Sequence, residues 1–135
     1  MIAAGDTLPT RTFGVTRAGL VRYAAASGDH NPIHWSDSQA ARVGLPGVIA
    51  HGMLSMGLAA TALAEWAGEG ATVTEYGTRF TRPVVVPDTA DGVEIAVDGV
   101  ASEVRDDGSV RVDLTVRSGT RKVLARTRAW VAYDR

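Results

Sequence analysis

Two places in the chain hold residues whose types and spacing could do chemistry. The segment Ser27–His34, SGDHNPIH, carries a carboxylate, Asp29, and an imidazole, His34. Pro32 disfavours helical geometry in the residue before it, so this segment must turn, and a turn can bring the two side chains together. Gly52 opens a long apolar run, where its backbone N–H would lack a helical partner at the positive end of the helix dipole. Such a set can add water to, or remove it from, a double bond conjugated with a carbonyl.

Two neighbouring residues are expected to support these groups rather than react. The Asn31 amide can lock the turn or orient His34. His51 directly precedes Gly52 and can hydrogen-bond within its loop, which would hold Gly52 in place. Each candidate also has a purely structural explanation: Asp29 could close an Asx turn, His34 could be a packed core histidine, and Gly52 could simply start a helix.

Helices and loops are predicted in the first half of the chain. Thr16 can cap a short helix that ends near Ser27-Gly28. A second short helix can begin at Ser36 or Asp37 and close at Gly44, before a Leu-Pro-Gly loop over 45–47. From Gly52 to about Ala67 nearly all residues are apolar and many are small, with no polar face before Glu65. We therefore expect this last helix to be enclosed on most of its sides.

Strands dominate the second half. Val110–Val116 alternates apolar residues with polar ones, which is typical of a strand with one buried face. Asp107-Gly108 is a strong signal for a hairpin turn before it, and Gly119-Thr120 marks a turn after it. The remaining predicted strands are Thr72–Phe80, its continuation over Val84–Val86, Val93–Val97 and Val123–Val131. A buried helix followed by an antiparallel meander predicts an α+β fold in which a curved sheet wraps around the helix.

Bulk properties exclude several classes of function. The chain has 135 residues, no cysteine and a net charge of −1, with Lys and Arg scattered along it, so nucleic acid is not an expected partner. The longest apolar run, Met53–Ala64, is too short to span a membrane, and the N-terminus lacks the pattern of a secretory signal. His30, His34 and His51 show no metal-ligand spacing, and the glycines form no nucleotide loop. We expect one cytoplasmic domain, residues 1–135, without metal or cofactor.

The order Ser-Gly-Asp-x-Asn-Pro-x-His and then His-Gly-Met resembles the MaoC-like, R-specific enoyl-thioester hydratase and dehydratase family. Thr74–Thr81, with Pro83 and Pro87, fits the same family. The resemblance implies a hot-dog fold, in which a long helix lies in a curved antiparallel sheet. It implies reversible dehydration of a (3R)-hydroxyacyl thioester, carried by acyl carrier protein or coenzyme A, to the trans-2-enoyl thioester, in fatty-acid elongation or related lipid metabolism. Asp29 and His34 would grip the catalytic water, and the Gly52 N–H would bind the thioester oxygen.

The same resemblance bears on partners and on alternatives. It is particularly close to the catalytic subunit of actinobacterial (3R)-hydroxyacyl-carrier-protein dehydratases, so a homodimer or a heterodimer with a sister hot-dog chain is expected. Some members place a serine two turns into the central helix, where this chain has Ala60, and Ser55 lies earlier. Arg42, Arg79 and Arg82 could meet a carrier's phosphates, although a solvated surface is the simpler explanation. An acyl thioesterase is an alternative, but the only acid on the predicted helix is Glu65, at its far end. A non-catalytic acyl-binding partner subunit is another, which the presence of Asp29 and His34 disfavours.

Overall fold

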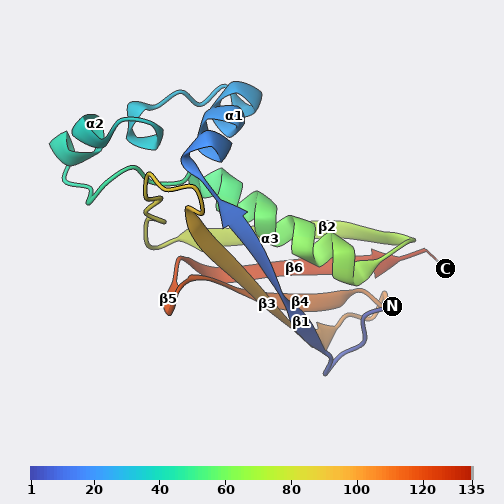
Figure 1. Cartoon of the computed structure of the whole chain (residues 1–135). Coiled ribbons are helices and arrows are strands. Elements are labelled where there is room, and N and C mark those ends of the chain that lie inside the picture. The colour runs from blue at the N-terminus through green and yellow to red at the C-terminus, as the bar shows by residue number, and fades with distance from the viewer. Residues whose placement is uncertain (135) are drawn as a thin grey trace.

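The computed structural model describes residues 1–134 and shows one long helix lying along a curved antiparallel sheet (Figure 1). The helices are α1 (Arg17–Ser27), the 3-10 turn η1 (Pro32–His34), α2 (Asp37–Arg42) and α3 (Gly52–Ala67). The strands are β1 (Thr7–Val15), β2 (Ala71–Phe80), β3 (Val93–Val104), β4 (Val110–Ser118), β5 (Arg121–Lys122) and β6 (Leu124–Tyr133). None of the helices in this described part has the length and apolar character needed to cross a membrane.

The sheet confirms the predicted α+β hot-dog fold, although it is not a simple meander. Its order is β1-β3-β4-β6-β2, all neighbours pair antiparallel, and the short β5 pairs with β4. The strand that follows α3 therefore crosses to the edge beside the last strand instead of pairing with the next one. Figure 1 shows α3 against this sheet and a lobe of α1, η1 and α2 beyond one of its ends.

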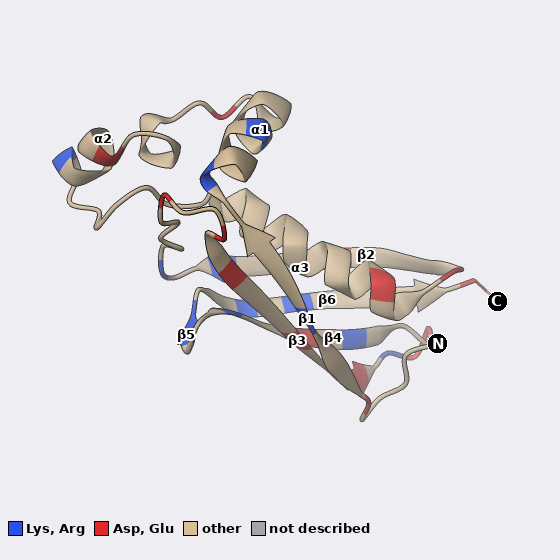
Figure 2. Ribbon diagram, viewed as in Figure 1, with Lys and Arg blue, Asp and Glu red and all other residues tan. Residues whose placement is uncertain are grey.

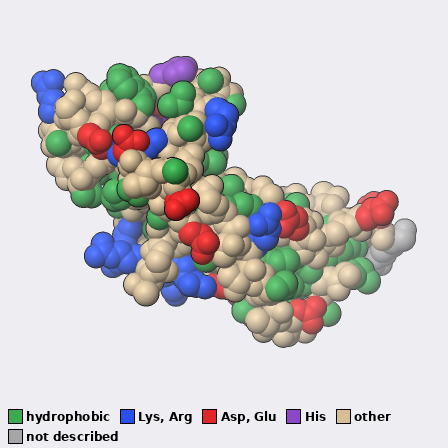
Figure 3. All heavy atoms as spheres, in the orientation of Figure 1, with side chains coloured by type: hydrophobic (Ala, Val, Ile, Leu, Met, Phe, Trp, Pro, Cys, Tyr) green, Lys and Arg blue, Asp and Glu red, His purple; other side chains and the backbone are tan. Residues whose placement is uncertain are grey.

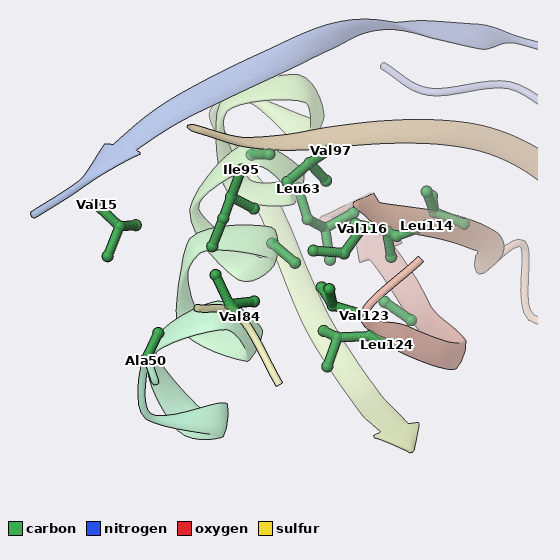
Figure 4. Packing of buried hydrophobic residues seen from close by; sticks show 14 of the residues in the cluster. Val15, Ala50, Leu63, Val84, Ile95, Val97, Leu114, Val116, Val123 and Leu124 are labelled. Carbon is green, nitrogen blue, oxygen red and sulfur yellow. The ribbon is translucent and has the colours of Figure 1, made fainter. Parts of the chain in front are cut away.

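The core lies between one face of α3 and the sheet. Leu63 extends from the helix among Ile95, Val97 and Val116, all of them fully buried (Figure 4). The other α3 residues on this face are Ser55, Ala59, Ala62 and Ala67. Their small size lets the helix backbone approach the strands closely. The expectation that α3 is enclosed on most sides is wrong for the single chain, because Met53, Gly57 and Thr61 on the opposite face are exposed.

The caps of the short helices are as predicted. Thr16 accepts a hydrogen bond from the backbone N–H of Gly19, and Gly28 ends α1 with a φ of 76°, a left-handed geometry that glycine adopts without strain. Ser36 accepts from the N–H of Gln39 at the start of α2. Gly44, with a φ of 83°, closes α2 through a hydrogen bond to Ala41. These caps fix the ends of the segment between them, which carries Asp29 and His34.

Two strand predictions are wrong. Helices and loops were predicted for the first half, yet it also contains β1, which pairs with β3 at an edge of the sheet. Its register shifts between Leu8 and Arg11, beside Pro9, so its sequence does not alternate as a regular strand would. Val84–Val86 does not continue β2. It bonds instead to the loop before α3, through an isolated bridge between Val85 and Ile49.

Candidate active site

The segment between α1 and α2 folds into a turn held by its own side chains. Asp29 Oδ1 accepts a hydrogen bond from the N–H of Asn31 at 3.1 Å, and Asn31 Oδ1 accepts one from the N–H of Ile33 at 3.2 Å. These two links lead directly into η1, whose last residue is His34. Asn31 therefore locks the turn, as predicted, and its bonds are to backbone rather than to the His34 ring.

The turn brings Asp29 and His34 together, as the sequence predicted. Asp29 Oδ2 lies 3.8 Å from His34 Nε2, a gap that a water molecule on the pocket side could bridge. The His34 ring is buried, whereas the Asp29 side chain is 52% exposed. His34 Nδ1 lies 2.7 Å from the carbonyl oxygen of Ile49, which can only accept, so Nδ1 carries the proton of the neutral ring. Nε2 is thereby left as a proton acceptor that faces the carboxylate.

His51 supports this pair through its ring as well as through a hydrogen bond. Its Nε2 donates to the carbonyl oxygen of Asp29 at 3.1 Å, which ties the turn to the start of α3. Its ring stacks on the His34 ring with centroids 3.7 Å apart, and Tyr23 meets it edge-on at 4.7 Å. Burial lowers the pKa of His51, and Nδ1 has no partner among the described residues. The His51 ring therefore packs against the His34 ring, and its lowered pKa favours the uncharged form.

Gly52 is the first residue of α3, as predicted, and Phe80 from the end of β2 lies against it. A side chain at position 52 would place its Cβ 2.9 Å from two carbons of the Phe80 ring. Only glycine is compatible with the Phe80 ring in this place. The backbone N–H of Gly52 belongs to the first turn of α3, where N–H groups have no carbonyl acceptor within the helix, and it lies at the positive end of the helix dipole.

These groups border one pocket of about 570 Å³. Asp29, His34 and Gly52 lie on its wall together with Ile33, Phe80 and Leu124. Most of the remaining wall is apolar, which suits an acyl chain. The sequence assigned no role to Ser55, yet it is buried on this wall. Its position one helical turn after His51 could have predicted this placement, and the Ser55 N–H donates to the His51 carbonyl oxygen.

Other sequence-based assignments near the site have mixed outcomes. Phe80 lines the pocket, and Tyr76 is half-buried with its hydroxyl donating to the Met56 carbonyl; burial raises the pKa of Tyr76 to about 12. Trp35, which directly follows η1, is 55% exposed, and its indole donates to the His30 carbonyl. Glu65, the helix acid that a thioesterase would use, is ion-paired with Arg11 at 2.8 Å, away from the pocket.

The site contains one cluster with ligand types that metals use. One ligand atom each from Asp29, His34 and His51 lies within 4.8 Å of the others. The two imidazole planes are only 21° apart and stacked, however, so their in-plane lone pairs run side by side and do not converge on one ion. His51 Nε2 is also engaged with the Asp29 carbonyl. This geometry does not favour a metal ion shared by the three side chains.

Two dehydratases are similar to this chain in sequence. 3-Hydroxyacyl-thioester dehydratase X of Mycobacterium tuberculosis is 43% identical over 82 residues, which are 61% of this chain and 28% of that protein. 3-Hydroxybutyryl-CoA dehydratase of Methylorubrum extorquens is 32% identical over 111 residues, which are 82% of this chain and 68% of that protein. The chain thus spans a minor part of the first relative and about two thirds of the second.

Solved structures share the fold. The unliganded R-hydratase PhaJ1 from Pseudomonas aeruginosa superposes with a TM-score of 0.83 at 29% identity, over 98% of this chain and 82% of that one. The ChsH1–ChsH2 complex from Mycobacterium tuberculosis gives a TM-score of 0.82 at 20% identity, with both chains fully covered. The profile of the MaoC like domain matches residues 3–120, and the chain therefore belongs to the MaoC-like dehydratase family.

Proposed function

We propose that this protein is a hydro-lyase that interconverts (3R)-hydroxyacyl thioesters and trans-2-enoyl thioesters plus water. One observation carries the proposal: His34 Nε2 faces the Asp29 carboxylate at 3.8 Å on the wall of an apolar pocket that also borders Gly52. The dehydratase names of the two sequence relatives and the hydratase name of PhaJ1 support the same chemistry. We assign the reaction to one domain, residues 1–135, acting in fatty-acid elongation or related lipid metabolism.

Each group has a defined task in the hydration direction. Asp29 and His34 hold a water between them, and His34 Nε2 takes a proton from it as the water oxygen bonds to C3 of the enoyl group. The electron pair of the C2–C3 double bond then resides in an enolate, whose charge lies largely on the thioester oxygen. The Asp29–His34 pair then returns a proton to C2 of the enolate, which gives the hydroxyacyl thioester. A positioned proton transfer of this kind contributes about 10²- to 10⁴-fold to the rate.

The Gly52 N–H would stabilise the enolate oxygen. An unpaired N–H at a helix start is a fixed donor that needs no reorganisation when charge develops, and such a donor can lower the barrier by about 3 kcal/mol. The absence of a side chain at position 52 lets the Phe80 ring pack against the start of the helix on the pocket wall. Asn31 and His51 position the reacting pair, through the turn and through the stacked ring.

We further propose that the active protein is a dimer, either of two copies or with a sister hot-dog chain. The similar structure from Mycobacterium tuberculosis is a complex, ChsH1–ChsH2. In this chain Met53 and Phe80, at the pocket, are 60% and 55% exposed, and the pocket-side strand β2 is a sheet edge. A second chain over this region would cover these apolar groups and lengthen the pocket.

A hydration assay tests the function. Loss of enoyl absorbance is followed with trans-2-enoyl thioesters of several chain lengths, with and without a candidate sister chain. We expect wild-type turnover and a fall of about 10²- to 10⁴-fold in Asp29→Asn and His34→Ala, with unchanged circular dichroism. Chiral analysis should give the R product. Release of free thiol by the wild type without loss of the double bond would instead identify a thioesterase.

A further inference from the structure

Five cations that the sequence disperses come together at one end of the sheet. They are Arg79, Arg82, Arg121, Lys122 and Arg126, and we call them the basic surface. Two segments supply all of them, residues 77–87 and 119–133, and neither segment contains an aspartate or glutamate. The expectation that basic residues are scattered is therefore wrong for this part of the fold.

The pairing of the strands explains the cluster. Arg79 on β2 lies opposite Ala125 on β6, next to Arg126. The N–H groups of Thr81 and Arg82 both donate to the carbonyl oxygen of Val123, which directly follows β5 with its Arg121 and Lys122. Figure 2 shows the blue segments at the β5 end of the sheet, and Figure 3 shows Lys and Arg side chains gathered below the α1–α2 lobe.

The five side chains are exposed and have no ion-pair partner among residues 1–134. In the same range six other arginines each pair with an acid, namely Arg11, Arg17, Arg105, Arg111, Arg117 and Arg128. Glu75 lines a hollow together with Arg126, but it is ion-paired with Arg105. Asp88 and Asp91 lie in the loop before β3, and Glu94 at the start of β3 pairs with Gly14 on β1, with β4 between β3 and β6. The basic surface is thus left unneutralised in a chain whose net charge is −1.

Arg126 occupies a backbone conformation that favours glycine. Its φ is 50°, and it lies where the β2–β6 register shifts between Gly77 and Arg79, at a β-bulge. Arginine at such a position is strained, and strain of this kind persists where a side chain has a task.

The basic surface adjoins the mouth of the catalytic pocket. Arg82 belongs to both, and the pocket wall continues through Val123 and Leu124, beside the other four cations. We infer that the basic surface docks an acidic acyl carrier protein whose acyl arm enters the pocket, a reading that rests on the function proposed above. Arg82 lines the pocket mouth and Arg126 lines a second hollow, whereas Arg79, Arg121 and Lys122 lie on open surface, so the cations extend from the mouth along β2, β5 and β6. That spacing fits an extended acidic protein face better than the compact phosphates of coenzyme A.

The test compares one enoyl group on three carriers: an acidic acyl carrier protein, coenzyme A and N-acetylcysteamine, which has no charge. The variant is Arg121→Glu, and the matched control is Arg22→Glu, which makes the same charge change at an exposed, unpaired arginine on α1. We expect the ratio of kcat/KM for the carrier-protein substrate to kcat/KM for the N-acetylcysteamine substrate to fall about tenfold in Arg121→Glu and to stay unchanged in Arg22→Glu. Binding of the unacylated carrier protein, measured by calorimetry, should weaken in parallel and lose part of its salt dependence.

Arg126→Gly separates docking from stability. We expect its melting temperature to equal or exceed that of the wild type, because glycine fits the positive φ, while the Kd for the carrier protein rises. Equal ratios in Arg121→Glu and wild type, or an equal fall in Arg22→Glu, would overturn the docking surface. A fall that is as large with coenzyme A as with the carrier protein would assign the surface to nucleotide phosphates instead. Wild-type hydration of the N-acetylcysteamine substrate would leave the proposed function intact in each of these cases.

Discussion

The two carboxylate oxygens of Asp29 have different roles, one structural and one chemical. Oδ1 accepts the Asn31 N–H and shapes the turn, while Oδ2 faces His34. The structural and the chemical explanations of this residue are therefore not alternatives, because the hydrogen bond that forms the turn also aims the second oxygen. In Asp29→Asn, the amide oxygen can still accept the Asn31 N–H, but the charge that faces His34 is lost.

This division predicts different effects of two substitutions on stability. Asp29→Ala removes the acceptor of the Asn31 N–H and should lower the free energy of unfolding by about 1 kcal/mol. Asp29→Asn keeps an oxygen at that position and should cost much less, although both variants lose activity. Urea titrations at neutral pH measure the difference. Equal stabilities of the two variants would show that Oδ1 does not hold the turn.

His51 makes stability depend on pH. Burial keeps its pKa in the folded chain below the value of about 6.5 expected in the unfolded chain. As pH falls through this window the unfolded chain takes up a proton that the folded chain does not, so the free energy of unfolding falls. His51→Gln can still donate to the Asp29 carbonyl but does not titrate. We expect its loss of stability between about pH 7.5 and about pH 5.5 to be smaller than that of the wild type, measured by urea titration.

The residues of the turn were predictable, and the packing behind them was not. The motif around Asn31 and Pro32 dictates a turn by local backbone rules, so the meeting of Asp29 with His34 follows from residues close in sequence. The stacking of His51 on His34 depends on how the start of α3 packs against the end of α1, where Tyr23 meets the same ring. Such contacts are set by tertiary packing, and spacing along the chain carries no sign of them.

At the level of elements, the start of α3 and the end of β2 form one unit around Gly52. Gly52→Ala places a Cβ 2.9 Å from the Phe80 ring, on the pocket wall beside the backbone N–H that we propose binds the thioester oxygen. Phe80 is half-exposed and can swing away, so we expect only a small change in melting temperature. Activity should fall about 100-fold, since a displacement of about 1 Å at the reacting centre can cost that much. Steady-state hydration assays and thermal melts provide the measurements.

The double variant Gly52→Ala/Phe80→Ala is the control for this prediction. Removing the ring relieves the clash within the protein but leaves the added methyl group in the path of the thioester. We therefore expect activity to stay low. Recovery of wild-type activity in the double variant would show that the clash with Phe80, and not access to the backbone N–H, caused the loss.

The elements that sequence reasoning missed lie at edges and bulges. A central strand such as β4 is buried on one face and alternates regularly, so its pattern is visible. β1 is an edge strand with Pro9 at a register shift, and it needs fewer apolar residues because only one neighbour and one face constrain it. Val84–Val86 has the composition of a strand, but Pro83 before it and Pro87 after it confine it to a short bridge with the loop before α3.

Across the whole molecule, the surface of the sheet and the free face of α3 differ in kind. Several residues of β3, β4 and β6 and their neighbours form ion pairs, including Arg117 with Asp98 and Arg111 with Glu103. Ion pairs of this kind are typical of a sheet surface that is exposed to solvent. The free face of α3 instead exposes Met53, Gly57 and Thr61, with no charge before Glu65. The asymmetry indicates which face another chain would cover.

A substitution at Gly57 tests whether another chain covers the free face of α3. A glycine in a helix interior costs stability, and at position 57 an added Cβ would meet nothing within 4 Å in the single chain. Close packing of a second chain against the helix would account for this glycine. Gly57→Glu should leave the isolated fold as stable or more so, and yet convert a dimer to a monomer in sedimentation velocity. Gly14→Glu is the matched control, because Gly14 lies on β1, at the opposite sheet edge from β2, and is equally open. A Gly57→Glu protein that sediments as the wild-type dimer would place the interface elsewhere. A wild type that sediments as a monomer by itself would require the sister chain, and mixing with that chain should then restore the dimer in Gly14→Glu but not in Gly57→Glu.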